Sequence, residues 1–196
     1  MSSKINKLSP YIGEKVYLRA LEMSDLDSIM EHWNTYESRI GLGRYIPNSR
    51  TDRQEWIRKN VEDMKQQYSF TFAIINKENE EFLGVCALKR VDKINKNAFM
   101  SVAIYNPKNH GKGFGTDTVK CLLNIGFDTL NLHRIELHVY DFLKSAIHVY
   151  EKLGFKHTGT RRKASYIAGM YVDDLIMDII EHEYREKVSS EETSLS

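Results

Sequence analysis

Cysteine and proline are scarce in this chain, and neither sign of charge dominates. The 196 residues include two cysteines and three prolines, and 28 Lys and Arg oppose 27 Asp and Glu, a formal net charge of +1. Binding to a nucleic-acid backbone needs a surplus of basic side chains. The composition therefore argues against DNA or RNA as a partner, although it leaves room for an acidic patch that faces a cationic substrate.

Two cysteines are too few for a disulfide framework. Cys86 and Cys121 both fall inside segments whose apolar pattern predicts buried elements. We therefore expect free, buried thiols in a reducing compartment, with a structural and not a catalytic role for both.

Long apolar runs are missing as well. No stretch approaches the roughly 20 apolar residues that cross a bilayer. The first residues also lack the pattern of a secretory signal peptide. We therefore expect no membrane partner and, by default, a cytoplasmic location.

The remaining composition fits one globular domain. Hydrophobic residues make up 41% of the chain and charged residues 28%, as in an ordinary folded protein, and a chain of this length builds one full core. We expect a flexible N-terminus over residues 1–12, a single domain over 13–186 and a disordered polar tail over 187–196.

Apolar periodicity divides the domain into strands and helices. We expect one helix to begin at Ser24 and a second to be capped by Thr51, with a loop over residues 34–47 between them. Two later helices are expected over 115–130 and 145–153. The expected strands are 16–20, 70–75, 82–88, 98–105, 133–140, 155–162 and 170–180.

The loop at residues 109–116, Asn-His-Gly-Lys-Gly-Phe-Gly-Thr, joins an expected strand to an expected helix. Its three glycines at alternate positions let the backbone turn tightly and approach a ligand. Free amide groups at the start of the following helix, together with the helix dipole, favour an anion at this place. The loop therefore has the character of a pyrophosphate site.

Two common phosphate motifs do not fit this loop. The dinucleotide fingerprint needs G-x-G-x-x-G, whereas these glycines alternate, and the P-loop needs Gly-Lys-Ser/Thr, whereas Lys112 precedes Gly113. On the loop alone, a flexible turn without a ligand remains an alternative.

A second motif follows the loop at a fixed distance. Residues 145–155 read Ser-Ala-Ile-His-Val-Tyr-Glu-Lys-Leu-Gly-Phe and contain the pattern Tyr-x-x-x-Gly-Phe. Together the two motifs resemble the GNAT N-acetyltransferase superfamily, whose phosphate loop reads Gln/Arg-x-x-Gly-x-Gly/Ala. The resemblance covers about residues 13–184. The start, Val-Tyr-Leu-Arg-Ala at 16–20, is similar to the branch that acetylates ribosomal-protein N-termini, and residues 126–184 are also similar to spermidine N-acetyltransferases.

The resemblance implies an α+β (mixed α/β) fold with a mostly antiparallel twisted sheet. The sheet would have six to seven strands, splayed between strands 4 and 5 and flanked by about four helices. Acetyl-CoA would be the co-substrate, with backbone groups of the fourth strand along its pantetheine arm and the glycine loop at its pyrophosphate. The implied binding residues are Val102, Ala103, Ile104, His110, Gly111, Lys112, Gly113, Phe114, Gly115, Thr116, Leu143 and Ala146.

Two of these positions depart from the family pattern. Leu143 stands where the family often has Asn, and Asp141 is close enough to cap the next helix in its place. His110 replaces Gln or Arg at a position that contributes mainly backbone. The Lys112 side chain either adds a charge contact to the phosphates or is solvated.

Tyr150 occupies the family's general-acid position. A phenol with a reference pKa near 10 stays protonated at neutral pH, so it can give its proton to a leaving thiolate. The alternative is a tyrosine that only packs between helix and sheet.

The family's general base has no obvious counterpart. Many members carry Glu at the second position of the fourth strand, where this chain has Phe99. Strand alternation places Glu136 and His138 on one face of the next strand, which makes either a candidate base. Glu31 and His32 are weaker candidates. No metal site is expected.

These observations predict an N-acetyltransferase that acts on a primary amine. A protein N-terminal amine has a reference pKa near 8 and needs less help from a base than a polyamine, whose pKa is near 10. The missing strand carboxylate therefore favours a protein N-terminus, with spermidine or another small amine as the alternative. A non-catalytic CoA-binding module and a general nucleotide-binding domain remain further alternatives, and an exposed hairpin edge would suit a homodimer.

Overall fold

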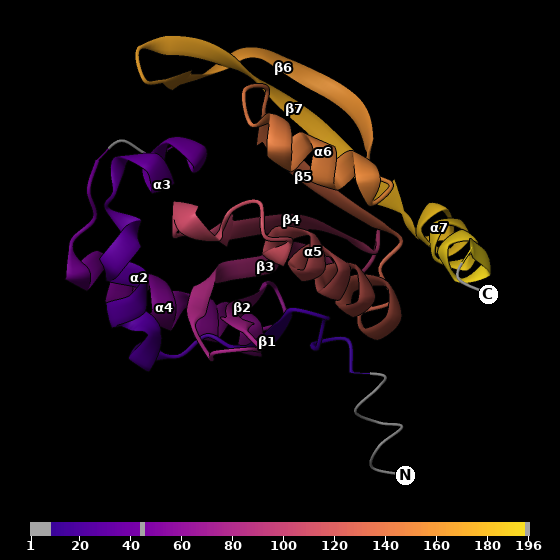
Figure 1. The fold of residues 1–196 in the computed structure, drawn as a ribbon, viewed down its shortest axis with the longest axis horizontal. Coiled ribbons are helices and arrows are strands. Elements are labelled where there is room, and N and C mark those ends of the chain that lie inside the picture. The colour runs from indigo at the N-terminus through magenta and orange to yellow at the C-terminus, as the bar shows by residue number, and fades with distance from the viewer. Residues whose placement is uncertain (1–8, 44–45, 195–196) are drawn as a thin grey trace.

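A single seven-stranded sheet forms the centre of the molecule (Figure 1). The structure is a computed structural model and describes residues 9–43 and 46–194. The strand order is β1-β2-β3-β4-β5-β7-β6, and every neighbouring pair except β4–β5 is antiparallel. The strands are β1 (Val16–Ala20), β2 (Phe70–Asn76), β3 (Phe82–Asp92), β4 (Asn97–Ile104), β5 (Arg134–Tyr140), β6 (Lys156–Ile167) and β7 (Met170–Ile180). The expected α+β fold is confirmed.

Strands β4 and β5 run parallel and pair at one end only. The paired residues are 97–99 of β4 and 134–136 of β5, whereas β4 continues to Ile104 and β5 to Tyr140. The two strands therefore diverge, as the family resemblance implied. From Met100 onward, the edge of β4 that faces β5 has no strand partner among the described residues.

Six α-helices surround the sheet in the described part of the chain. They are α2 (Leu26–Trp33), α3 (Tyr36–Gly41), α4 (Arg50–Lys65), α5 (Phe114–Asn124), α6 (Lys144–Lys152) and α7 (Glu181–Ser194). One hydrophobic cluster joins α2 and α4 to one face of β2 and β3, and a larger cluster joins α5 and α6 to the other face. The irregular turns are η1 (Met23–Asp25), η2 (Pro107–Asn109) and a π-helical continuation of α5, η3 (Ile125–Thr129). None of the described helices is long and apolar enough to cross a membrane.

Helix α3 and the cap of α4 differ from the sequence-based expectation. Residues 34–47 were expected to be a loop, but α3 forms within them; residues 44 and 45 lie outside the described part. Helix α4 is capped by Ser49 and not by Thr51. The Ser49 hydroxyl accepts from the Asp52 N–H at 3.1 Å, and the Asp52 carboxylate accepts from the Ser49 N–H at 2.9 Å. This reciprocal pair satisfies two donors at the start of the helix.

The described residues nearest the two chain ends contact the rest of the structure. Residues 1–8 lie outside the described part, but Leu18 N–H donates to the Tyr11 carbonyl at 2.8 Å, and the Tyr11 ring packs on Phe72. At the other end, α7 follows β7 directly and extends to Ser194. Tyr184 anchors this helix, because its ring stacks on Phe127 with centroids 5.0 Å apart.

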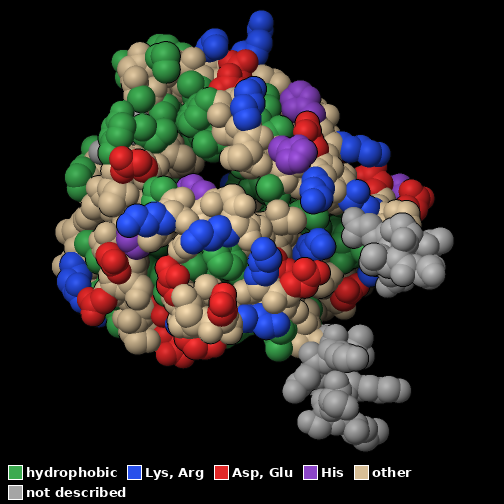
Figure 2. All heavy atoms as spheres, viewed as in Figure 1, with side chains coloured by type: hydrophobic (Ala, Val, Ile, Leu, Met, Phe, Trp, Pro, Cys, Tyr) green, Lys and Arg blue, Asp and Glu red, His purple; other side chains and the backbone are tan. Residues whose placement is uncertain are grey.

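On the face that Figure 2 shows, Lys and Arg side chains are interspersed with Asp and Glu side chains. Apolar side chains gather on that face over the end of the β6–β7 hairpin, and the surface is hollowed below it. The exposed apolar residues of this hairpin end are Tyr166, Met170 and Tyr171.

Candidate active site

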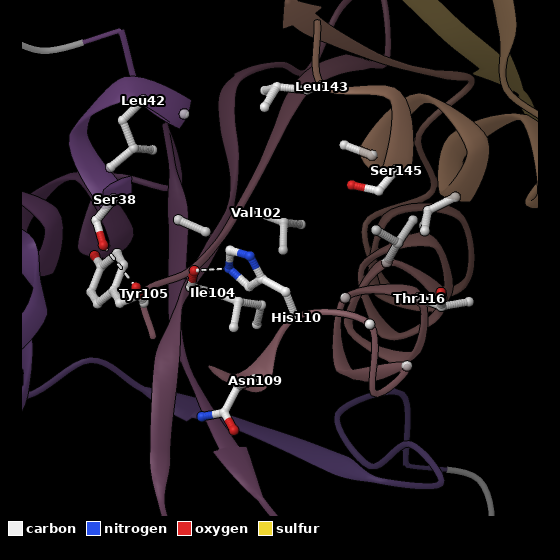
Figure 3. Close-up of a pocket in the computed structure, with 18 of the residues that line it drawn as sticks. Ser38, Leu42, Val102, Ile104, Tyr105, Asn109, His110, Thr116, Leu143 and Ser145 are labelled. Carbon is white, nitrogen blue, oxygen red and sulfur yellow. Dashed lines mark hydrogen bonds between the residues drawn. The ribbon is translucent and has the colours of Figure 1, made fainter. Parts of the chain in front are cut away.

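A cavity of about 390 Å³ lies where β4 and β5 diverge (Figure 3). Its walls come from α3, the end of β4, the glycine loop with the first turns of α5, and α6. In Figure 3, Ser38 and Leu42 lie on one side of the cavity and Thr116 and Ser145 on the other. The lining residues are Glu37, Ser38, Gly41, Leu42, Val102, Ala103, Ile104, Tyr105, Asn109, His110, Gly111, Gly113, Gly115, Thr116, Val119, Leu143, Ser145, Ala146, Val149 and Tyr150.

The glycine loop presents bare backbone to this cavity. Gly111 has φ +74° and Gly113 has φ +88°, conformations that side-chain-bearing residues rarely adopt. Gly113 is also the N-cap of α5. A Cβ built on Gly111 or Gly115 would have no other atom within 4 Å, so the backbone here borders open space. The loop therefore fits a pyrophosphate, which the amides and dipole of a helix start would bind.

Side chains from three places fix the loop in position. His110 Nε2 lies 2.9 Å from the Ile104 carbonyl oxygen at the end of β4, so the tautomer that bears hydrogen on Nε2 donates to it (Figure 3). Asn109 Nδ2 donates to Glu81 Oε1 at 2.8 Å, and Lys15 Nζ donates to the Lys112 carbonyl at 2.7 Å. The family resemblance gave position 110 mainly a backbone role, and in the structure the His110 ring also links the loop to β4.

Asp117 supports the loop from the first turn of α5. Its buried carboxylate accepts three backbone N–H groups, from Glu14 at 3.0 Å, Lys15 at 2.7 Å and Val16 at 2.9 Å. These bonds join the segment before β1 to the helix that forms the phosphate site. The sequence analysis missed this residue, although an acidic side chain in a first helical turn is a recognisable signal.

The end of β4 forms the floor of the cavity. Val102, Ala103 and Ile104 all line it. Since β5 has diverged at this point, the backbone groups on that edge of β4 are available to a ligand with amide groups. The pantetheine arm of CoA is such a ligand.

Tyr150 lines the cavity from α6 and is half-buried. Its ring packs on Phe155 with centroids 5.7 Å apart. Its hydroxyl makes no hydrogen bond within the described part of the chain. Burial raises the pKa of Tyr150 to about 12, because the charged form would lose its hydration. The hydroxyl is therefore protonated at neutral pH and its proton is not engaged by another group.

The remaining expected binding residues divide into two groups. Leu143, Ala146 and Thr116 line the cavity, whereas the side chains of Lys112 and Phe114 do not. Leu143 is the N-cap of α6 and provides no side-chain hydrogen bond. The prediction that Asp141 caps this helix is therefore wrong.

Neither candidate base lines the cavity. Glu136 and His138 lie on the same face of β5, as predicted, but both are surrounded by charged partners. Arg134 donates to Glu136 at 2.6 Å and to Asp178 at 2.6 Å. The His138 nitrogens lie 3.4 Å from Glu136 and 3.3 Å from Asp174. These contacts compete with proton transfer from an amine.

Helix α3 supplies residues that the sequence analysis did not anticipate. Ser38 Oγ donates to the Tyr105 carbonyl at 2.7 Å, and a Cβ on Gly43 would stand only 2.1 Å from the Tyr140 hydroxyl. The segment therefore bridges the end of β4 and the end of β5 across the gap. It also brings the exposed carboxylate of Glu37 to the cavity wall. No local pattern predicts this helix, because tertiary contacts hold it in place.

The two cysteines are free and buried, as predicted. Burial raises the pKa of Cys121 to about 12 and that of Cys86 well above its usual range. Neither thiol is therefore a nucleophile at neutral pH. Among the described residues, no group of three or more His, Cys, Asp or Glu side chains is placed to hold a metal ion.

Comparison with known proteins shows the family to which this chain belongs. The model of the acetyltransferase (GNAT) domain matches residues 15–156. The chain belongs to the GNAT acetyltransferase family. GNAT enzymes use acetyl-CoA, so the acyl donor and the N-acetyltransferase activity expected from the sequence follow from membership.

Relatives from both expected branches resemble this GNAT chain along nearly its whole length. The spermidine N(1)-acetyltransferase of Vibrio cholerae is 28% identical over 184 residues, which cover 88% of this chain and 97% of the relative. The Bacillus subtilis protein YdaF, provisionally assigned as a ribosomal N-acetyltransferase, is 22% identical over 88% of this chain and 95% of its own.

A crystal structure of the Vibrio cholerae spermidine N-acetyltransferase, in complex with CoA and spermine, shares the fold. Its TM-score is 0.78 at 28% identity, covering 87% of this chain and 98% of that chain. The expected fold and the expected family are both confirmed.

Proposed function

We propose that this protein moves the acetyl group of acetyl-CoA to a primary amine of a small polyamine, with Tyr150 as the general acid. The observation that carries the proposal is that Tyr150 lines the cavity that begins at the glycine loop and that, within the described part of the chain, its hydroxyl has no hydrogen-bond partner. A thiolate leaving group needs a proton at this step.

Each wall of the cavity has one task in this reaction. The amides of residues 110–116 hold the pyrophosphate, and the free edge of β4 binds the pantetheine arm. Acetyl-CoA supplies the acetyl group and a thiol leaving group. Tyr150 gives its proton to the sulfur as the carbon–sulfur bond breaks and regains one from solvent, and the acceptor nitrogen passes a proton to water as its bond to the acetyl carbon forms.

Glu37 favours a polyamine acceptor. The sequence argument for a protein N-terminus rested on Phe99, which leaves β4 without the usual carboxylate. Glu37 brings a carboxylate to the same cavity from α3, where it attracts an ammonium group and accepts its proton through water. The similarity to spermidine N-acetyltransferases along most of the chain supports the same acceptor class.

A protein N-terminal amine is the second candidate. Its reference pKa near 8 leaves a useful neutral fraction at pH 7, so that it needs no strong base. Phe99 and the engaged state of Glu136 and His138 favour such an acceptor. The similarity to YdaF points the same way.

Thiol release from acetyl-CoA tests both candidates. The acceptor panel contains spermidine, spermine, amino acids, and peptides that begin with Ser, Ala or Met. We expect release with the polyamines and a strongly reduced rate in the Tyr150→Phe variant. Release with peptides alone would assign the N-terminal amine instead. CoA binding without release for any acceptor would contradict catalysis and support a non-catalytic module.

A further inference from the structure

A second cavity lies on the other side of the glycine loop. Its volume is about 480 Å³, and its lining residues are Glu14, Lys15, Asn76, Lys77, Glu78, Lys112 and Phe114. The loop forms the wall between the two cavities. Its three glycines line the first cavity, whereas the alternating Lys112 and Phe114 line the second.

Three lysines of this lining keep their charge uncompensated. Lys15 Nζ donates to the Lys112 carbonyl at 2.7 Å, Lys77 Nζ to the Gly13 carbonyl at 2.8 Å, and Lys112 Nζ to Asn109 Oδ1 at 3.3 Å. All three partners are neutral, and within residues 9–43 and 46–194 none of these lysines forms an ion pair. Each ammonium group has three hydrogens and therefore retains donors for an anion.

The lysines lie next to the glycine loop, so an anion bound by them would be close to the proposed pyrophosphate site. Lys15 Nζ lies 3.2 Å from the place where a Cβ on Gly113 would stand, so it borders the N-terminus of α5 directly. The buried Asp117 carboxylate beneath the loop is occupied by its three backbone donors. Glu14 and Glu78 also line the cavity, but the lysines outnumber them.

We infer that Lys15, Lys77 and Lys112 bind the 3′-phosphate of CoA. This inference rests on the proposed function, in which the glycine loop holds the pyrophosphate. In CoA, one ribose ring separates the 3′-phosphate from the pyrophosphate. When the pyrophosphate is held by the glycine loop, the 3′-phosphate therefore lies near the rim of that loop. Lys15, Lys77 and Lys112 supply positive charge at that rim.

Calorimetric titration of CoA and 3′-dephospho-CoA tests the inference without relying on turnover. We expect the wild-type protein to bind CoA about tenfold more tightly, as hydrogen bonds to a charged group allow. Lys77→Gln should reduce this ratio to below about threefold and leave the Kd of 3′-dephospho-CoA within about twofold of wild type. Lys77 is the test position because its Nζ bonds the Gly13 carbonyl, whereas the Lys15 Nζ bonds the Lys112 carbonyl and so holds the glycine loop itself.

Lys93→Gln is the matched control. Lys93 Nζ is likewise bonded to a neutral oxygen, Gln67 Oε1 at 2.8 Å, but it lies outside both cavities. Its variant should keep the full ratio. Equal affinities of the wild-type protein for the two ligands, or an unchanged ratio in Lys77→Gln, would overturn the inference and leave the proposed function standing. Failure to bind either ligand would instead refute the proposed function.

Discussion

Removal of the Tyr150 hydroxyl should affect the chemical step and leave acetyl-CoA binding almost unchanged. Tyr150→Phe keeps the ring that packs on Phe155. We expect kcat to fall about 100-fold or more, the range of a lost general acid, while the KM for acetyl-CoA changes by less than about threefold. Tyr166→Phe, at an exposed tyrosine of β6, is the control and should change neither constant. An unchanged kcat in Tyr150→Phe would exclude the acid role.

The pH profile provides a separate test of Tyr150. Its raised pKa of about 12 keeps the acid form present well above neutral pH. The rate should therefore rise as the acceptor amine loses its proton, and it should not fall on the alkaline side below about pH 11. Initial rates between pH 6 and pH 11, corrected for the uncatalysed hydrolysis of acetyl-CoA, measure this. A falling limb near the ordinary phenol pKa of about 10 would contradict the proposed environment.

At the scale of one element, the glycine loop predicts different results for neighbouring glycines. Gly113→Ala places a side chain at φ +88° beside Lys15, a strain of roughly 1–2 kcal/mol. Gly115 has ordinary helical backbone and open space around a Cβ, so Gly115→Ala should stabilise α5 by up to about 1 kcal/mol. We expect the Kd for CoA to rise about tenfold in the first variant and less than about threefold in the second. Urea unfolding and calorimetry measure both effects, and identical behaviour of the two variants would contradict the loop geometry.

The junction between β1 and α5 gives a stability prediction. Asp117→Asn turns an acceptor of three backbone N–H groups into a partial donor, so the free energy of unfolding should fall by roughly 2–3 kcal/mol. Asp128→Asn, which loses an exposed ion pair with Arg185, should cost less than about 1 kcal/mol. If urea unfolding gave equal losses of unfolding free energy for the two variants, the three Asp117 hydrogen bonds would contribute no more to stability than the exposed Asp128–Arg185 ion pair.

Elements whose structure depends on neighbouring residues could be predicted from the sequence, whereas elements held by distant contacts could not. The glycine loop and α6 carry their constraints in adjacent residues, and residues of both motifs line the cavity. Helix α3 depends on distant partners, since Ser38 bonds the end of β4 and Gly43 packs against Tyr140 of β5. Helix α7 likewise depends on the stacking of Tyr184 on Phe127. Such long-range contacts leave no apolar periodicity in the sequence. The sequence analysis therefore expected a loop where α3 forms, and it did not identify Glu37 as a residue of the cavity wall.

At the scale of the whole molecule, the β6–β7 hairpin lies at one edge of the sheet and exposes apolar side chains at its end. Strand β6 is the outer strand of the sheet, and an unpaired edge of this kind is a template for association. Tyr166, Met170 and Tyr171 at its end are 52%, 65% and 64% exposed, and the two tyrosine rings lie 5.0 Å apart. Arg162 and Lys163 on the same strand disfavour pairing of two identical edges through their charges. The aromatic end is therefore the better contact between copies.

Light scattering behind a sizing column tests whether the chain forms a homodimer or larger assembly through this hairpin end. We expect a mass of at least two chains at micromolar concentration, and a shift toward one chain in the Tyr166→Ser, Tyr171→Ser double variant. Tyr68→Ser, at a tyrosine of similar exposure that follows α4, is the matched control and should leave the mass unchanged. The double variant should unfold at the same urea concentration as wild type when both are monomeric, because neither ring contributes to the core. A wild-type mass of one chain at every concentration would exclude the contact, and association that survives the double variant would move it to another surface.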